Sequence, residues 1–219
     1  MKKLLLITLT GIFAIGFTAC QSGETAQSSV NQNNSATEAN QGTVAEDLTG
    51  VKPSRGTMKE SSPDAANAPY DLQFLDTMIE HHQDAVIMAK PIVAKTDNAE
   101  LKAFAAKIIA DQNKEIAQMK NWRKKWFAGK PAAMNAEIPG MMDSMRGMNM
   151  KKMETAGGKL LDLRFLDMMT KHHQGAITMS NEALDKAEHA EIKTLATQII
   201  KAQEAEIKQM QDWKTTWSR

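Results

Sequence analysis

Two adjacent histidines framed by methionines occur twice in this chain, and they are the side chains best suited to chemistry. The first copy reads DLQFLDTMIEHHQDAVIMA from Asp71, and the second reads DLRFLDMMTKHHQGAITMS from Asp162. Imidazole nitrogen and thioether sulfur together are ligands typical of copper, above all Cu(I), and of its soft relative Ag(I). Structural zinc sites use thiolates beside imidazoles, and Cys20 is the only cysteine of the chain. The pattern therefore predicts a site for a soft metal ion.

On a helix, His82 would point into the interior of a bundle. With a step of 100° per residue, Met78 and Ala85 fall within about 60° of His82, and His81 lies at the border of the same apolar stripe. A single inward histidine is usually a core residue with a hydrogen bond, but a duplicated pair with the same methionine frame favours a metal site. We expect the candidate ligands to share one cavity, and they are Met78, His81, His82, Met88, Met169, His172, His173 and Met179.

The segment that follows each copy carries polar residues on its inward stripe. Gln112, Glu115 and Met119 lie on this stripe in the first half, and Gln203, Glu206 and Met210 repeat them. A carboxylate that accepts the free N–H of a metal-bound imidazole satisfies both groups and fixes the orientation of the ring. We expect the Gln and Glu residues to support the ligands in this way, and Met119 and Met210 to be further ligands. A hydrogen bond between helices without a metal remains the alternative.

A methionine-rich segment connects the two halves. Residues 128–161 contain seven of the sixteen methionines of the chain. Methionines are more often adaptable core filler than ligands, but glycine and polar residues surround these. We expect Met142, Met145 and Met148 to be additional thioether ligands, and we expect the segment to be mobile without a metal ion.

The duplication extends beyond the histidines and predicts the fold. Residues 71–126 and 162–217 are identical at about 25 of 56 positions. Apolar residues at three- and four-residue spacing predict two helices in each half, at about 71–95, 97–127, 162–187 and 189–217. Short loops make each pair an antiparallel hairpin, so the hairpins 70–127 and 162–219 stack into an all-α four-helix bundle. We also expect a kink or break at Pro91 and a capping box of Asp97 with Glu100.

The N-terminal residues predict export. Residues 1–19 combine two lysines with a short apolar run and a small-residue cleavage region, as in a signal peptide. Cys20 follows directly, as in the lipobox of bacterial lipoproteins. We therefore expect lipidation of Cys20 to anchor the protein to a bacterial membrane, facing the periplasm or the cell surface. An ordinary secretion signal with a chance cysteine is the alternative. Residues 20–69 are rich in small polar side chains and predict a disordered tether.

The charge of the chain argues against a nucleic acid partner. The formal net charge is +1, and removal of Lys2 and Lys3 with the signal peptide takes it to −1. No basic stripe is left that could follow a phosphate backbone.

The repeated motif resembles the domain-of-unknown-function 305 family, whose characterised members include periplasmic copper-resistance proteins. The likeness rests on D-x-x-F-L-x-x-M-x-x-H-H-x-x-A-x-x-M at Asp71–Met88 and Asp162–Met179, and it covers about 70–217. It implies a ferritin-like antiparallel four-helix bundle that binds copper outside the cytoplasm. It also implies that the methionines and histidines of the two motifs, with the intervening methionines, are the ligands. The copies differ at Asp84/Gly175 and Thr77/Met168, so the two sites need not have equal affinity.

We therefore expect a non-enzymatic protein that binds Cu(I) and also Cu(II), with Ag(I) as a surrogate. It would sequester or deliver copper and so contribute to copper resistance or homeostasis. Its partners would be metal ions, the membrane through Cys20, and copper-exporting or copper-accepting proteins. A structural or interaction bundle without metal is the main alternative. A di-iron oxidoreductase of the ferritin-like type needs Glu-x-x-His pairs, and the chain contains none.

Overall fold

The computed structural model describes residues 60–218. The expected signal peptide at 1–19, Cys20 and the expected tether as far as residue 59 lie outside the described residues. Residues 60–218 contain no strand, and none of their helices combines the length and the apolar character needed to cross a membrane.

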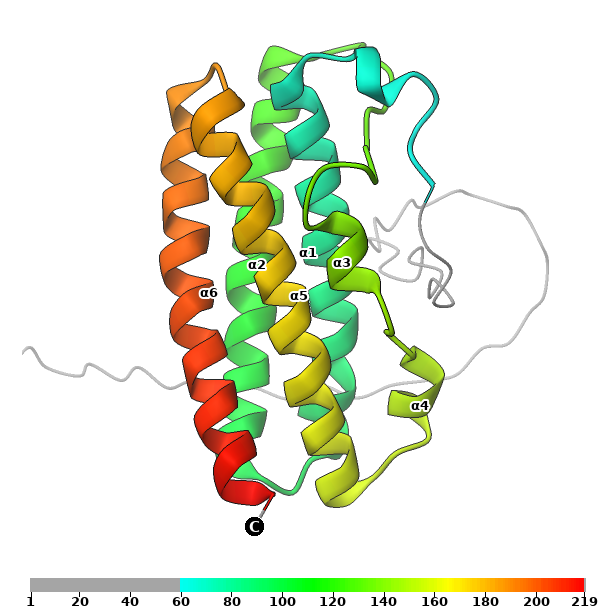
Figure 1. Cartoon of the computed structure of the whole chain (residues 1–219), viewed down its shortest axis with the longest axis vertical. Coiled ribbons are helices and arrows are strands. Elements are labelled where there is room, and N and C mark those ends of the chain that lie inside the picture. Colours follow the sequence, from blue (N-terminus) through cyan, green and yellow to red (C-terminus); the bar gives the residue numbers. More distant parts are fainter. Residues whose placement is uncertain (1–59, 219) are drawn as a thin grey trace, which may run out of the picture. The chain divides into compact units, whose positions relative to one another are not determined.

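Four long helices form an antiparallel bundle (Figure 1). α1 (Tyr70–Lys95) packs against α2 (Ala99–Trp126), α5 (Gly158–Lys186) packs against α6 (Ala190–Trp217), and α1 also contacts α5. The helices bury the apolar stripes that the sequence pattern places on one face of each. The all-α bundle of two duplicated hairpins is therefore confirmed.

The ends of the helices differ from the sequence prediction in two details. α1 remains helical through Pro91 to Lys95, so the chain does not break there. The N-cap of α2 is Asn98 rather than Asp97, and its Oδ1 accepts a hydrogen bond from the Leu101 N–H at 2.9 Å. Asn is among the strongest N-cap residues because its side chain satisfies an N–H that the helix leaves without a partner.

Two short helices in the connection, α3 (Met141–Met145) and α4 (Met150–Glu154), lie beside α5 (Figure 1). α3 approaches α5 closely because two glycines meet there: a Cβ on Gly175 would lie 2.5 Å from the carbonyl oxygen of Gly140. Gly140 also has a φ of 97°, which residues with a side chain rarely adopt. α5 itself begins at Gly158, somewhat before the predicted boundary at 162.

Residues 60–69, which the sequence assigns to the end of the tether, pack beside the start of the connection. The Ser62 N–H donates to the carbonyl of Met134 at 2.7 Å, and the 3-10 turn η1 (Ala65–Asn67) buries Ala65. The Gln73 side chain of α1 donates to the carbonyl of Ala68 at 2.7 Å. The folded part therefore includes the last ten residues of the predicted tether.

Two buried apolar clusters occupy different levels of the bundle. On α1, one cluster takes residues from 72 to 79 and the other takes residues from 85 to 92. On α5, the same two clusters take residues from 176 to 183 and from 161 to 169. We name them the Met78 cluster and the Met169 cluster after one buried member of each. The histidine pairs lie between the two clusters on both helices.

Candidate metal centre

All four motif histidines are fully buried at the middle of the bundle. The exposed fraction is at most 1 % for His81, His82, His172 and His173. His81 of α1 and His172 of α5 stack on each other, with ring centroids 3.6 Å apart and planes 28° apart. The pair lies where the two hairpins meet. The predicted inward position of His82 and His173 is confirmed, and His81 and His172, which the sequence places at the border of the apolar stripe, are buried as well.

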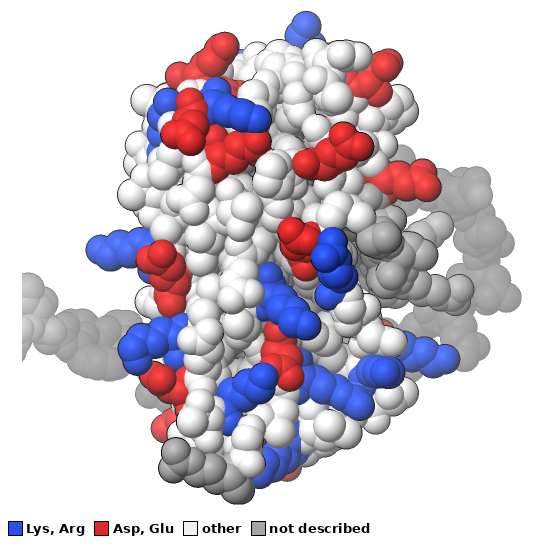
Figure 2. Space-filling model, viewed as in Figure 1, with Lys and Arg blue, Asp and Glu red and all other residues white. Residues whose placement is uncertain are grey.

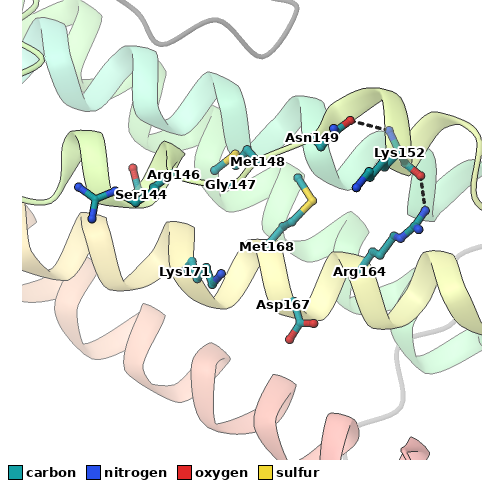
Figure 3. A pocket seen from close by; sticks show the side chains of 10 residues that line it. All are labelled: Ser144, Arg146, Gly147, Met148, Asn149, Lys152, Arg164, Asp167, Met168 and Lys171. Carbon is teal, nitrogen blue, oxygen red and sulfur yellow. Dashed lines mark hydrogen bonds between the residues drawn. The ribbon is translucent and has the colours of Figure 1, made fainter.

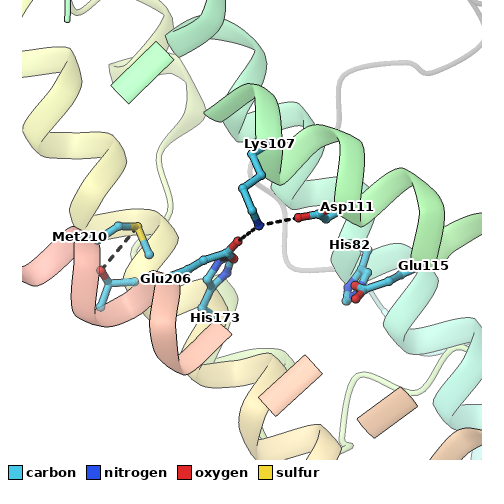
Figure 4. Close-up of polar contacts among 8 residues, drawn as sticks. His82, Lys107, Asp111, Glu115, His173, Glu206 and Met210 are labelled. Carbon is cyan, nitrogen blue, oxygen red and sulfur yellow. Dashed lines mark hydrogen bonds and ion pairs between the residues drawn. The ribbon is translucent and has the colours of Figure 1, made fainter. Parts of the chain in front are cut away.

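The other histidine of each pair is held by a carboxylate from the partner helix of its own hairpin. The Nε2 atom of His82 lies 2.7 Å from Oε2 of Glu115, and that of His173 lies 2.9 Å from Oε2 of Glu206 (Figure 4). An ionised carboxylate can only accept a hydrogen bond, so Nε2 carries the proton in each ring. Nδ1 then has a free lone pair, as a metal ligand requires.

The Nδ1 atoms of His82 and His173 are buried and have no hydrogen-bond partner within the described residues. Leaving a buried acceptor without a donor costs about 1–3 kcal/mol. A neutral imidazole with one nitrogen bound to a carboxylate and the other open is the arrangement of a histidine ready to bind a metal ion.

The carboxylate of Glu206 is stabilised in its charged form. Burial raises its pKa, but the hydrogen bond from His173 and the hydrogen bond and charge of the Lys107 ammonium outweigh burial and hold the pKa below its ordinary value. Lys107 lies 3.2 Å from Oε1 of Glu206. Glu206 therefore remains an acceptor for His173 near neutral pH.

Methionines lie one helical turn from each His–Glu contact. Moving four residues back along α1 from His82 and four forward along antiparallel α2 from Glu115 gives Met78 and Met119, about 6 Å farther along the bundle. Both are fully buried in the Met78 cluster. We define His82, Glu115, Met78 and Met119 as the first half-site.

The second hairpin repeats this arrangement. Met169 and Met210 stand in the same relation to His173 and Glu206, and both are fully buried in the Met169 cluster. We define these four residues as the second half-site.

The structure divides the methionines of each copy between the two clusters. Met88 packs in the Met169 cluster and Met179 packs in the Met78 cluster, so each cluster receives methionines from both hairpins. The predicted ligands therefore form two equivalent groups on either side of the stacked histidines. The expectation of one shared cavity did not foresee this division, because it depends on how the hairpins cross.

Gln112 and Gln203 are buried next to the half-sites. Their exposed fractions are 3 % and 2 %, and Oε1 of each has no hydrogen-bond partner within residues 60–218. Ala85 lies three residues after His82 on α1, and Gln112 lies three residues before Glu115 on antiparallel α2. Gln112 therefore falls opposite the small Ala85. Each hairpin thus places a buried amide oxygen without a hydrogen-bond partner within residues 60–218 one helical turn before the glutamate of its half-site.

The three methionines predicted as ligands in the connection lie farther out. Met142, Met145 and Met148 are half-buried. Of the three, Met148 packs against the Met169 cluster, and with Met168 it lines a pocket of about 170 Å³ beside α5 (Figure 3). The connection instead buries Met141 and Met153 completely, one in each cluster. Apolar flanks such as Ile138 before Met141 were the only sequence signal for this burial.

Carboxylates, imidazoles and thiolates alone do not make a metal site here. Among residues 60–218, no three His, Cys, Asp or Glu side chains are grouped so that they could hold an ion. Any ion bound at the histidines therefore has to use thioether or amide donors as well.

Solved structures with the same fold include copper and silver complexes. CopM in its Cu(I)-bound form is 35% identical, with a TM-score of 0.57 over 67% of this chain and 96% of that chain. The Cu(II)-bound form is 37% identical, with a TM-score of 0.58 and coverages of 67% and 97%. A DUF305 protein from Streptomyces coelicolor is 27% identical, with a TM-score of 0.61 over 71% of this chain and 95% of its own. No curated protein sequence matches the chain.

The family model described as "Domain of unknown function (DUF305)" matches residues 71–214, which include both histidine pairs and all four bundle helices up to the last turn. The chain belongs to the DUF305 family.

Proposed function

We propose that this protein binds copper outside the cytoplasm, and that it takes Cu(I), and Ag(I) as its analogue, through paired imidazole and thioether donors. One observation carries the proposal. His82 and His173 each give their Nε2 proton to a carboxylate and keep a buried Nδ1 that no donor faces within residues 60–218. A soft cation at Nδ1 would satisfy both atoms.

The donors around each histidine suit a soft ion. Each half-site offers one imidazole nitrogen and two thioether sulfurs, a set that favours Cu(I) and Ag(I) over Zn(II). Thioethers also remain usable as ligands where an oxidising environment would consume free thiols. The CopM structures with Cu(I), Cu(II) and Ag support this assignment, because they match 67% of this chain at 35–37% identity.

The charges also match a monovalent ion. Bringing an ion into the middle of the bundle costs solvation energy, which a nearby opposite charge offsets. Each half-site contains one carboxylate, Glu115 or Glu206, which contacts the far side of the ligating ring. One monovalent ion for each half-site would therefore leave the buried layer close to neutral, and we infer two ions for each chain.

The proposed role is binding rather than catalysis: the protein would hold copper and release it to an acceptor, and so limit free copper at the cell envelope. The expected signal segment and Cys20 support a lipid-anchored position outside the cytoplasm. The Streptomyces coelicolor relative, for which secretion has been suggested, supports the same compartment.

Competition for Cu(I) with a chromophoric chelator, without oxygen, tests the proposal. Wild-type protein should remove two equivalents of Cu(I) from the chelator. The quadruple variant M78L/M119L/M169L/M210L should lose this ability while its helical circular dichroism remains, because Met and Leu have similar volumes. H189Q and M134L are matched controls, since neither residue belongs to a half-site.

A variant without the four thioethers that competes as strongly as wild-type protein would overturn the proposal. Competition as strong as that of wild-type protein by H82A/H173A would also overturn the proposal, provided that circular dichroism shows a folded bundle. In that case the histidines and methionines would be a packing arrangement, and the metal-free structural bundle would be the better description.

A further inference from the structure

A groove between α2 and α6 leads from solvent to both His–Glu contacts. It has a volume of about 330 Å³ and is lined by residues of these two helices, among them Gln112, Glu115, Gln203 and Glu206. The side chains of Glu115 and Glu206 are 20% and 11% exposed, whereas the histidines that they contact are fully buried. The two carboxylates therefore connect the solvent in the groove to the imidazoles of the two half-sites.

The charges of this groove suit a cation better than those of the pocket on the other side of the bundle. The pocket beside α3, α4 and α5 is lined by Arg146, Lys152, Arg164 and Lys171, and its carboxylate Asp167 is paired with Lys214 (Figure 3). Lys and Arg also gather around α4 and the first half of α5 on the molecular surface (Figure 2). The α2–α6 groove is lined by three carboxylates, Asp111, Glu115 and Glu206, and by one lysine, Lys114.

A second lysine, Lys107, does not line the groove but contacts one of the two carboxylates that contact the histidines. Lys107 of α2 reaches across to Glu206 of α6 at 3.2 Å and also contacts Asp111 at 2.6 Å (Figure 4). The repeat places Gln198 at the position equivalent to Lys107, and Ala202 at the position equivalent to Asp111. Glu206 therefore shares its carboxylate with an ammonium group, whereas the corresponding cross-groove position near Glu115 holds a neutral amide.

We propose that copper ions reach the buried histidines through the α2–α6 groove, and that Lys107 makes the second half-site the weaker and slower of the two to load. The inference rests on the proposed function, because it concerns the order in which the two half-sites fill. A positive charge beside Glu206 opposes a second cation, and it contacts Oε1, the carboxylate oxygen that does not contact His173. At the effective dielectric of a protein surface, such a charge changes affinity by about tenfold.

The difference in Cu(I) affinity between the two half-sites can be measured with variants that each keep only one of them. M169L/M210L leaves the first half-site intact, and M78L/M119L leaves the second, in both cases in the full chain and with side chains of similar volume. Competition for Cu(I) should show about tenfold tighter binding by the first variant. Adding K107Q to M78L/M119L should raise the Cu(I) affinity of the second half-site by most of this factor. Adding Q198K to M169L/M210L should lower the affinity of the first half-site by a similar factor.

One matched control variant and a salt series accompany these variants. K208Q removes an exposed lysine of α6 that pairs with Asp212 at 2.8 Å and does not line the groove, so it should leave both half-sites unchanged. The factor between the half-sites should also shrink as salt rises, because exposed charges are screened. Equal affinities, or a K107Q effect no larger than that of K208Q, would overturn the assignment of Lys107.

The route is tested separately by filling the groove. Ala202 lines the groove, whereas Ala205 is exposed on the same helix and does not line it. A202F should slow the uptake of Cu(I) in stopped-flow mixing without changing the number of ions bound, and A205F should not. Equal uptake rates for the two variants would overturn the route. Absence of any Cu(I) binding by wild-type protein would instead overturn the proposed function, and this inference with it.

Discussion

His81 and His172 occupy the same position in the two repeats and stack face to face, with ring centroids 3.6 Å apart. This contact relates the two hairpins by an approximate two-fold axis that passes between α1 and α5. The lone pairs of an imidazole lie in the plane of its ring, so stacked rings direct them side by side rather than toward a common point. The stack therefore separates two half-sites instead of forming one site between the rings.

We expect replacement of the stack to leave the bundle stable. In H81L/H172L, the contact between the two stacked rings is replaced by aliphatic side chains of similar size, and the free energy of unfolding should change by less than about 1 kcal/mol. Urea unfolding followed by circular dichroism measures this change. A fall of more than about 1 kcal/mol would contradict it, and would show that the rings hold the hairpins together through their polar atoms.

Glu115→Gln tests whether the carboxylate selects the protonated nitrogen of His82. A Gln side chain can donate to Nε2, which moves the proton of the ring to Nδ1 and blocks the proposed ligand atom. Removal of such a supporting carboxylate lowers metal affinity by about 10- to 100-fold. Chelator competition in the M169L/M210L background isolates this half-site, and Glu204→Gln, at an exposed position of α6, is the control. Equal affinity in the two variants would contradict the prediction.

The stability that Glu206 contributes should depend on pH in a defined direction. Its pKa in the folded protein lies below the ordinary value of 4.5 because the hydrogen bond from His173 and the ammonium of Lys107 outweigh burial. A lowered carboxyl pKa stabilises the fold fully above pH 4.5, and this stabilisation disappears as the pH falls through the folded-state value. The difference in unfolding free energy between wild type and Glu206→Gln should therefore be constant near neutral pH and shrink below pH 4.5. A difference that grows on acidification would have the wrong sign.

The fold and the identity of the buried residues could be predicted because both follow from local pattern. The spacing of Leu75, Met78 and His82 on a helix is enough to predict that they are buried. The second copy has the same spacing and so gives the same prediction independently. A contact between an inward histidine and a carboxylate of the partner helix could also be predicted, although a simple mirror of one helix on the other places His82 level with Gln112 rather than with Glu115, its actual partner. These inferences need only the geometry of one helix and one turn.

The grouping of the methionines could not be predicted in the same way. Whether Met88 meets Met78 or Met169 depends on how two hairpins cross, and no spacing within either copy contains that information. Positions at which the two copies differ indicate tertiary contacts better than the spacing does. Gly175, where the first copy has Asp84, is the point at which α3 packs on α5. A break in a repeat thus marked a contact made only once.

Gly175→Ala should test this contact. An added Cβ would lie 2.4 Å from Cβ of Ser144 and 2.5 Å from the carbonyl oxygen of Gly140, both closer than real contacts. Gly→Ala inside a helix normally stabilises by about 1 kcal/mol, but overpacking costs about 1–3 kcal/mol, so we expect a net loss. Hydrogen exchange should accelerate in α3 and remain unchanged in α6. Unchanged exchange in α3 would contradict the prediction.

Asp71 and Asp162 begin the two copies of the motif, yet they have different partners. The Asp71 carboxylate accepts hydrogen bonds from Nδ1 of His189 at 2.5 Å, from the His189 backbone N–H at 2.9 Å and from the Glu188 N–H at 3.0 Å. It thereby joins α1 to the start of α6. The equivalent partner of Asp162 would be Asn98, but Asn98 caps its own helix, and Oδ1 of Asp162 has no hydrogen-bond partner within the described residues.

Asp71→Asn should therefore destabilise the protein much more than Asp162→Asn. The first change replaces one accepting oxygen by an amide NH₂ that faces existing donors, at a cost of about 2 kcal/mol for hydrogen bonds to a charged group. The second should stay within about 0.5 kcal/mol of wild type. Urea unfolding of both variants measures the difference, and His189→Gln should remove part of the Asp71 effect because the two residues share a hydrogen bond. Equal losses of unfolding free energy for the two variants would contradict the prediction. They would mean that the shared position in the repeat, rather than the contact with His189, determines how much each aspartate stabilises the protein.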